Sequence, residues 1–179
     1  MINKANFHIH TIVTSEETDN WCLPRWIFSY YCTIFNIRPK IDCCAFDTYH
    51  LCDKYFTKKD DMFKQTVKED FYMNPMYSRI DECMEWAWQQ VEENGVSALI
   101  CVNANVGSGW FQTYIWKPFL SDIKQGQYGK RVLLEFHSRI KFLNRYGQIP
   151  KHKGQDGVER ENVAMYYSAF CKINHGSIL

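Results

Sequence analysis

The stretch FYMNPMYSRIDECMEWAWQQVEENGVSALICV, residues 71–102, has the pattern of a strand, a helix and a second strand in succession. Phe71–Met73 is a short apolar run that Asn74-Pro75 ends, because both residue types favour turns. Residues 78–94 have helical spacing, and Val96–Val102 is an apolar run typical of a buried strand. This order predicts a strand–helix–strand unit of an α/β domain.

The helix predicted over 78–94 carries its own start and stop signals. We expect Ser78 and Asp81 to form a pair resembling a capping box, and Gly95 to end the helix. Apolar side chains recur on one face, which predicts that this face packs on the sheet: Ile80, Met84, Ala87 and Val91.

Strand-like and helix-like segments also alternate on both sides of this unit. Pro24–Phe35 is predicted to be a helix with proline in its first turn, and Lys40–Ala45 a short apolar strand. The remaining predictions are three strands, Arg131–Phe136, Arg139–Leu143 and Val163–Cys171, and a mobile polar loop over Gly147–Glu161. We therefore expect one α/β domain with a doubly wound, mostly parallel sheet that binds ligands at the carboxyl ends of its strands.

The composition fits one domain of ordinary size that works inside a cell. The 179 residues are 46% hydrophobic and 23% charged, which excludes a disordered or fibrous chain. No stretch approaches the roughly 18 uninterrupted apolar residues of a membrane-spanning helix, and the N-terminal residues lack the apolar run of a secretory signal. We expect residues 1–18 to be an N-terminal extension and residues 19–179 to form the domain.

Charge is distributed unevenly, although the formal net charge is +1. Residues 117–153 hold nine Lys or Arg against two acidic residues, a balance of +7, whereas residues 57–95 hold nine acidic against five basic residues, a balance of −4. A basic segment on a nearly neutral protein predicts a face that meets a polyanion such as nucleic acid. A solvated face without a partner explains the same charge equally well.

The eight cysteines do not have the spacing of a disulfide scaffold or of a zinc site. There is no Cys-x-x-Cys pair, and the close histidines His8 and His10 have no cysteine pair at zinc-site spacing. We expect thiols that pack as small apolar groups, and no metal site.

Asn74-Pro75-Met76-Tyr77 is the segment with the most chemical content. In one interpretation it is an ordinary strand-to-helix turn, in which Asn and Pro are turn formers and Tyr77 packs. In the other, an apolar strand delivers a carboxamide and an aromatic ring to the rim of the sheet, where ligands bind.

The whole chain supports the second interpretation, because it resembles the phage-type DNA adenine-N6 methyltransferase family. The motif itself is similar to the Asn-Pro-Pro-Tyr signature of amino-methylating methyltransferases. Further short matches follow in the family's order from Ser15 to Cys171: Ser15, Asp19, Trp21 and Pro24 in SEETDNWCLP; Ile41-Asp42-Cys43-Cys44-Ala45; Tyr55-Phe56-Thr57 with Asp60-Asp61-Met62; the strand over 96–102; Trp110-Phe111; and Ser138-Arg139-Ile140-Lys141-Phe142.

The resemblance implies a methyltransferase domain over residues 19–179. Its fold would be the Rossmann-like, S-adenosylmethionine-dependent type, a doubly wound sheet with an antiparallel C-terminal strand. It also implies methylation of the exocyclic N6 amine of adenine in DNA by a protein of viral or prophage origin, in the cytoplasm of the host cell.

The resemblance assigns catalysis to Asn74, Pro75 and Tyr77. The side-chain oxygen of Asn74 and the carbonyl of Pro75 would accept hydrogen bonds from the adenine amine, which is a poor nucleophile because its lone pair is conjugated with the ring. The ring of Tyr77 would stack on the target base once that base has left the double helix.

The resemblance also implies two sets of binding residues. S-adenosylmethionine would be bound by five residues, of which Asp42 would meet its ribose or amine directly or through water and Asp61 its adenine: Trp21, Asp42, Cys43, Ala45 and Asp61. Double-stranded DNA, with the target base flipped, would be contacted by Met76, Trp110, Arg139 and Lys141. A turn at Asp60-Asp61, a core role for Trp21 and a structural role for Trp110-Phe111 are the competing interpretations.

The sequence departs from the family at three positions. Met76 replaces a proline of the signature, Leu23 replaces a threonine and Ser138 replaces a glycine. Two alternative functions therefore stay open: a relative with impaired catalysis that binds cofactor or nucleic acid, and an amino-methyltransferase that acts on RNA or on cytosine.

Overall fold

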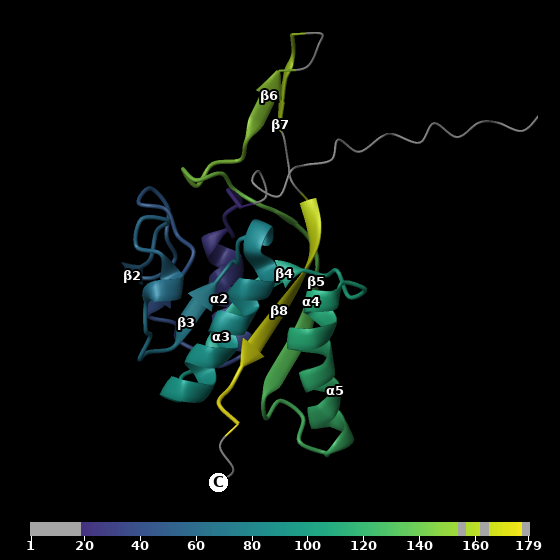
Figure 1. Cartoon of the computed structure of the whole chain (residues 1–179). Helices are drawn as coiled ribbons and strands as arrows, with labels where there is room; N and C mark the ends of the chain where they lie inside the picture. The colour runs from purple at the N-terminus through teal and green to yellow at the C-terminus, as the bar shows by residue number, and fades with distance from the viewer. Residues whose placement is uncertain (1–18, 154–156, 162–164, 177–179) are drawn as a thin grey trace, which may run out of the picture.

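The computed structural model describes residues 19–153, 157–161 and 165–176. In this part of the chain a central sheet has six strands in the order β2-β1-β3-β4-β8-β5 (Figure 1). The bounds of these strands are Ile41–Asp42 (β1), Lys54–Tyr55 (β2), Phe71–Met73 (β3), Ala98–Asn103 (β4), Val132–Lys141 (β5) and Met165–Ile173 (β8). The predicted extension over 1–18, with the Ser15 match, lies outside the described residues.

The sheet is mostly parallel, as predicted. Strands β2, β1, β3 and β4 pair in parallel, whereas β8 pairs antiparallel with β4 on one side and with β5 on the other. The predicted antiparallel C-terminal strand is therefore confirmed, and it lies inside the sheet. Because β5 runs in the same direction as β4, the carboxyl ends of β1, β3, β4 and β5 share one edge of the sheet.

Helices pack on both faces of the sheet (Figure 1). On one face, α2 (Arg25–Ile34) contributes to a core that includes Tyr72 and Phe170. On the other face, α3 (Ile80–Asn94) packs with a helical run made of α4 (Gly109–Phe111), the π-helical η3 (Gln112–Trp116) and α5 (Lys117–Lys124). None of the helices in the described ranges combines the length and the apolar character that a membrane crossing requires.

The β3–α3 unit forms where the sequence predicts it. All three residues of β3 are buried, and the predicted apolar face of α3 (Ile80, Met84, Ala87, Val91) is buried as well. Gly95 ends the helix with a φ of 67°, a left-handed conformation that glycine adopts without steric cost.

The predicted capping box at the start of α3 is wrong. Residues Tyr77–Arg79 form a single 3-10 turn, η2, so that α3 begins at Ile80 and its cap position is Arg79 without a side-chain cap. The Ser78 hydroxyl instead donates to the carboxylate of Asp19, 59 residues away in the chain. A distant partner has replaced the local one.

Two other predictions need correction. The strands expected over 131–136 and 139–143 are one strand, β5, because an irregularity in register between His137 and Arg139 lets pairing with β8 continue through the polar residues. The loop expected over Gly147–Glu161 contains an antiparallel hairpin of β6 (Lys151–Lys153) and β7 (Glu159–Glu161), which stands out from the sheet edge (Figure 1). An ion pair between Lys151 and Glu159, at 3.2 Å, supports this strand pair, which hydropathy does not reveal.

Candidate active site at the carboxyl edge of the sheet

Asn74 follows β3 directly and lies at the carboxyl edge of the sheet, partly buried. Its side-chain nitrogen Nδ2 donates to the backbone carbonyl of Trp21 at 2.7 Å. This bond fixes the orientation of the carboxamide. The side-chain oxygen Oδ1 makes no hydrogen bond within the described part of the chain, so it remains able to accept one.

Tyr77 joins this motif to the end of the neighbouring strand. Its phenol oxygen accepts a hydrogen bond from the backbone N–H of Asn103, the last residue of β4. Its ring meets Trp110 edge-on, with 6.4 Å between the ring centres. Tyr77 is half-buried.

Pro75 and Met76 complete the motif in different environments. Pro75 is buried, whereas Met76 is half-buried and packs against the core shared with α3. The carbonyl of Met76 accepts from the N–H of Arg79 at 3.1 Å, which closes the η2 turn. Met76 therefore contributes its backbone to the turn.

The segment before α2 is held against the motif at two points. Besides the bond between Trp21 and Asn74, both carboxylate oxygens of Asp19 accept hydrogen bonds from Ser78, one from its N–H at 3.1 Å and one from its hydroxyl. The indole nitrogen of Trp21 is buried and has no hydrogen-bond partner in the described residues. A buried donor without a partner is costly, which makes this nitrogen a candidate ligand contact.

Asp42 ends β1 and is 4% exposed. One of its carboxylate oxygens accepts from the N–H of Leu51 at 3.0 Å and the other from the N–H of Cys44 at 3.4 Å. Burial raises the pKa of Asp42 from 3.8 to about 6, against the opposing effect of these two hydrogen bonds. The side chain thus anchors the loop between β1 and β2.

Cys43 and Ala45, the other predicted residues of this loop, are also buried. The N–H of Cys43 donates to the carbonyl of Tyr72 at 2.9 Å, and the N–H of Ala45 donates to that of Phe56 at 2.9 Å. Their amides therefore extend the ladder of the sheet past β1. Cys43 and Ala45 can therefore offer a ligand only their backbone carbonyls and their small side chains.

The Asp60-Asp61 segment is a turn, as the structural interpretation expected. Asp60 accepts from both the N–H and the hydroxyl of Thr57 at 2.7 and 2.8 Å. Asp61 has a φ of 54° and pairs with Lys64 at 3.0 Å, and the hydrogen bond from Lys64 lowers the pKa of its carboxyl. The next residue, Met62, has its sulfur 3.4 Å from Sγ of Cys44, which brings the turn beside the β1 loop.

The predicted DNA contacts are spread along the same edge. Trp110 lies beside Tyr77, while Phe111 is fully buried and anchors α4 to the sheet, so the structural interpretation holds for Phe111. Arg139 is exposed with its guanidinium 5.1 Å from the centre of the Tyr167 ring, and Lys141 pairs with Glu161 at 3.5 Å. Neither of these two basic side chains contacts the Asn74 motif in the described residues.

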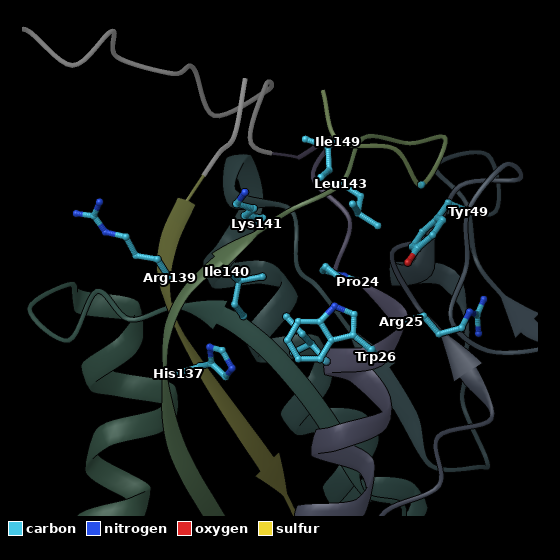
Figure 2. Close-up of a pocket in the computed structure, with 12 residues that line it drawn as sticks. Pro24, Arg25, Trp26, Tyr49, His137, Arg139, Ile140, Lys141, Leu143 and Ile149 are labelled. Carbon is cyan, nitrogen blue, oxygen red and sulfur yellow. The ribbon is translucent and has the colours of Figure 1, made fainter. Parts of the chain in front are cut away.

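A groove near these basic residues was missed by the sequence analysis. It encloses about 810 Å³ between the start of α2 and the end of β5, and Trp26, Tyr49 and His137 are among its lining residues (Figure 2). The available signal was Trp26 and Tyr30 on α2, two aromatic residues four positions apart that are both exposed. A comparison of the apolar and exposed faces of this helix would have singled them out.

The thiols and acids form no metal site in the described residues. All eight cysteines fall within the described ranges; none is in a disulfide, and six are buried. Across residues 19–153 and the two later described segments, no cluster of three or more His, Cys, Asp or Glu side chains has an arrangement that could hold a metal ion.

Comparison with known proteins agrees with this geometry. The family model for DNA N-6-adenine-methyltransferase (Dam) matches residues 10–167. The chain is also similar to the DNA N-6-adenine-methyltransferase of Haemophilus phage HP1 (strain HP1c1), with 22% identity over 145 residues that cover 80% of this chain and 74% of that protein. Because the family match spans most of the chain, including the Asn74 motif and the segment that orients it, this protein belongs to the DNA N-6-adenine-methyltransferase (Dam) family.

Proposed function

We propose that this protein transfers the methyl group of S-adenosylmethionine to the N6 amine of adenine in double-stranded DNA, with the target base flipped out of the helix. The observation that carries the proposal is the orientation of Asn74. Its Nδ2 is held by the carbonyl of Trp21 at 2.7 Å, which leaves Oδ1 able to accept hydrogen bonds from the target amine. Membership of the family supports the choice of reaction.

The reaction needs acceptors more than it needs a strong base. Hydrogen bonds from the two amine hydrogens to Asn74 Oδ1 and to the carbonyl of Pro75 would turn the nitrogen lone pair toward the methyl donor and stabilise the positive charge that develops on nitrogen. Acceptors held rigidly by a buried proline and by the Trp21 carbonyl need no reorganisation during the reaction.

Tyr77 is the stacking surface for the flipped base in this proposal. Its hydroxyl is fixed by the N–H of Asn103, and Trp110 supports the ring from the side. The ring is therefore held in place before the base arrives, which lowers the entropic cost of capturing it.

S-adenosylmethionine supplies a methyl group that is already activated on a sulfonium, and the residues at the edge fit its binding in part. The unpartnered indole nitrogen of Trp21 lies in the segment that orients Asn74, and Asp61 offers a carboxylate on a turn beside the β1 loop. We infer that these two side chains, with the backbone at Cys43 and Ala45, contact the cofactor. Asp42 would position the loop through Leu51 and Cys44.

Two alternative functions compete with this proposal: a relative with impaired catalysis, which the Met76 replacement suggests, and an enzyme that acts on RNA or on cytosine. A relative with impaired catalysis is disfavoured, because the side chain of residue 76 takes no part in the hydrogen bonds of the turn and the Pro75 carbonyl is present with either residue. Adenine and cytosine both carry an exocyclic amine that Asn-Pro-x-Tyr could bind, in DNA and in RNA, so membership of the family carries the choice of adenine in DNA.

One assay tests the reaction and these alternatives together. The protein is incubated with S-adenosylmethionine labelled in the methyl group and with unmethylated double-stranded DNA or RNA, and the product is digested to nucleosides. We expect label in N6-methyldeoxyadenosine, and none with the Asn74→Ala variant under the same conditions. Label in a cytosine derivative or in RNA would replace the proposed substrate, and binding of the cofactor without transfer would support the impaired relative.

A further inference from the structure

The groove between α2 and β5 has the surface of a site for a flat, anionic ligand. Its floor is apolar, with Ile27 and Ile140 almost fully buried and with Pro24, Leu143 and Ile149 beside them. The side chain of Trp26 extends into this groove from α2, opposite Ile140 and His137 of β5 (Figure 2).

Trp26 is 69% exposed, although packing an indole against a neighbouring apolar surface is one of the larger favourable terms in folding. It lies at the mouth of a groove of about 810 Å³. A large aromatic ring left in water beside an apolar floor is typical of a binding surface, and nucleobases stack on such rings regardless of sequence.

The charge of the groove favours a polyanion. Its lining residues include Arg25, Arg139 and Lys141 and no acidic residue. Arg25 donates to the backbone carbonyls of His50 at 2.8 Å and Leu51 at 3.4 Å, and its charge interacts with the buried carboxylate of Asp42. The positive charge available to a ligand therefore comes mainly from Arg139 and Lys141. Lys141 pairs with Glu161 at 3.5 Å, and this ion pair is exposed and weak enough for a phosphate to displace it.

The groove is connected to the Asn74 motif through a short segment. Trp21 orients Asn74, and Pro24, three residues later, lines the groove. Between them, Cys22 exchanges two backbone hydrogen bonds of 2.8 Å with Leu143, which is also a lining residue. The carbonyl of Leu23 accepts from the hydroxyl of Tyr49, at 2.9 Å. The motif and the groove are thus held in a fixed relation.

We propose that this groove is a second DNA subsite, which binds an unpaired nucleotide of the target DNA, with its nucleobase stacked on Trp26 and a flanking phosphate beside Lys141. The inference rests on the proposed function for the choice of DNA as partner. It adds a contact that discriminates unpaired from paired bases, away from the catalytic motif.

The probe is a short fluorescently labelled oligothymidylate, because it has no adenine for the catalytic motif and its binding requires no methyl transfer. Its dissociation constant is measured by anisotropy for the wild type and for Trp26→Ala and Trp26→Phe. Loss of one stacked base should weaken binding roughly tenfold or more, and phenylalanine should restore most of it. Lys141→Ala should reduce the salt dependence by about one phosphate contact.

Tyr128→Ala is the matched control, because Tyr128 is an aromatic residue of similar exposure, 65%, at the other end of β5. It should bind oligothymidylate as the wild type does. Thermal unfolding of all variants checks that each of them keeps the fold of the wild type.

Two results would overturn the proposal: equal binding by wild type and Trp26→Ala, or competition between oligothymidylate and S-adenosylmethionine, which would make the groove part of the cofactor site. Neither depends on catalysis. If the protein methylates adenine and Trp26→Ala binds oligothymidylate as the wild type does, the proposed function holds and the subsite is wrong. If the protein methylates no adenine but loses oligothymidylate binding in Trp26→Ala, the subsite holds and the proposed function is wrong.

Discussion

Two polar residues end neighbouring strands of the same sheet and are used in opposite ways. The side-chain nitrogen of Asn74, after β3, donates to Trp21, and its oxygen has no hydrogen-bond partner in the described residues. Both carboxylate oxygens of Asp42, at the end of β1, accept hydrogen bonds from the chain itself. The difference arises from the path of the chain after each strand. The chain after β3 turns into a helix and leaves the side chain open, while the chain after β1 folds back and directs the N–H of Leu51 at the acid.

The largest effect is expected from Asn74→Ala. Turnover should fall on the order of a hundredfold or more, because one preorganised acceptor is lost from the transition state. The affinity for S-adenosylmethionine, measured by calorimetry, should change little. If the variant methylates DNA at the wild-type rate, Asn74 belongs with Asp42 as a structural residue.

Asp42→Ala should act on folding instead of on the reaction. It leaves the N–H groups of Leu51 and Cys44 without their acceptor in a buried loop, which should cost about 2 kcal/mol of unfolding free energy. Asp42→Asn is the matched control, since its side-chain oxygen still accepts one of these bonds. Denaturant unfolding should show Asp42→Ala to be less stable than Asp42→Asn. If Asp42→Ala is stable but fails to bind the cofactor, Asp42 is a cofactor-binding residue.

The same carboxylate should make stability depend on pH. Because burial raises the folded-state pKa of Asp42 from 3.8 to about 6, the folded state binds the proton more tightly. The resulting stabilisation is fully present below pH 4 and is lost as the pH rises through 6, a difference of about 3 kcal/mol for a shift of this size. The difference in stability between wild type and Asp42→Asn, followed from pH 4 to pH 7, isolates this group. A constant difference would contradict it.

The two Tyr77 variants should give a graded effect, which is smallest for Tyr77→Phe. Tyr77→Ala removes the stacking ring and should weaken base capture by roughly 1–3 kcal/mol. Tyr77→Phe keeps the ring and loses the acceptor for the N–H of Asn103, so we expect a modest drop in turnover, measured by steady-state kinetics, with the fold preserved. A phenylalanine variant as impaired as the alanine variant would show that the hydroxyl, and not the ring, matters.

Local patterns predicted the β3–α3 unit well and missed what depends on distant partners. The apolar spacing of α3 and the stop at Gly95 follow from neighbouring residues, and both appear in the structure. The hydrogen bonds from Ser78 to Asp19 could not be predicted in this way, because no local rule brings together residues that lie 59 positions apart. For the same reason the sequence predicted a strand over Lys40–Ala45 but did not reveal that the strand ends at Asp42 and that Leu51 returns to its carboxylate.

The position of β8 has a consequence for how the chain is made and folded. This strand, residues 165–173, lies between β4 and β5, so β5 has no partner in the central sheet until β8 has been synthesised. Until residues 165–173 have been made, the nascent chain would expose the edge of β4 and, once it is synthesised, an unpaired β5. Closing the sheet then depends on contacts between β4 and β8 that are distant in sequence, which slows folding. We therefore expect refolding to be slow and prone to aggregation at high protein concentration, and truncation within β8 to abolish the native sheet.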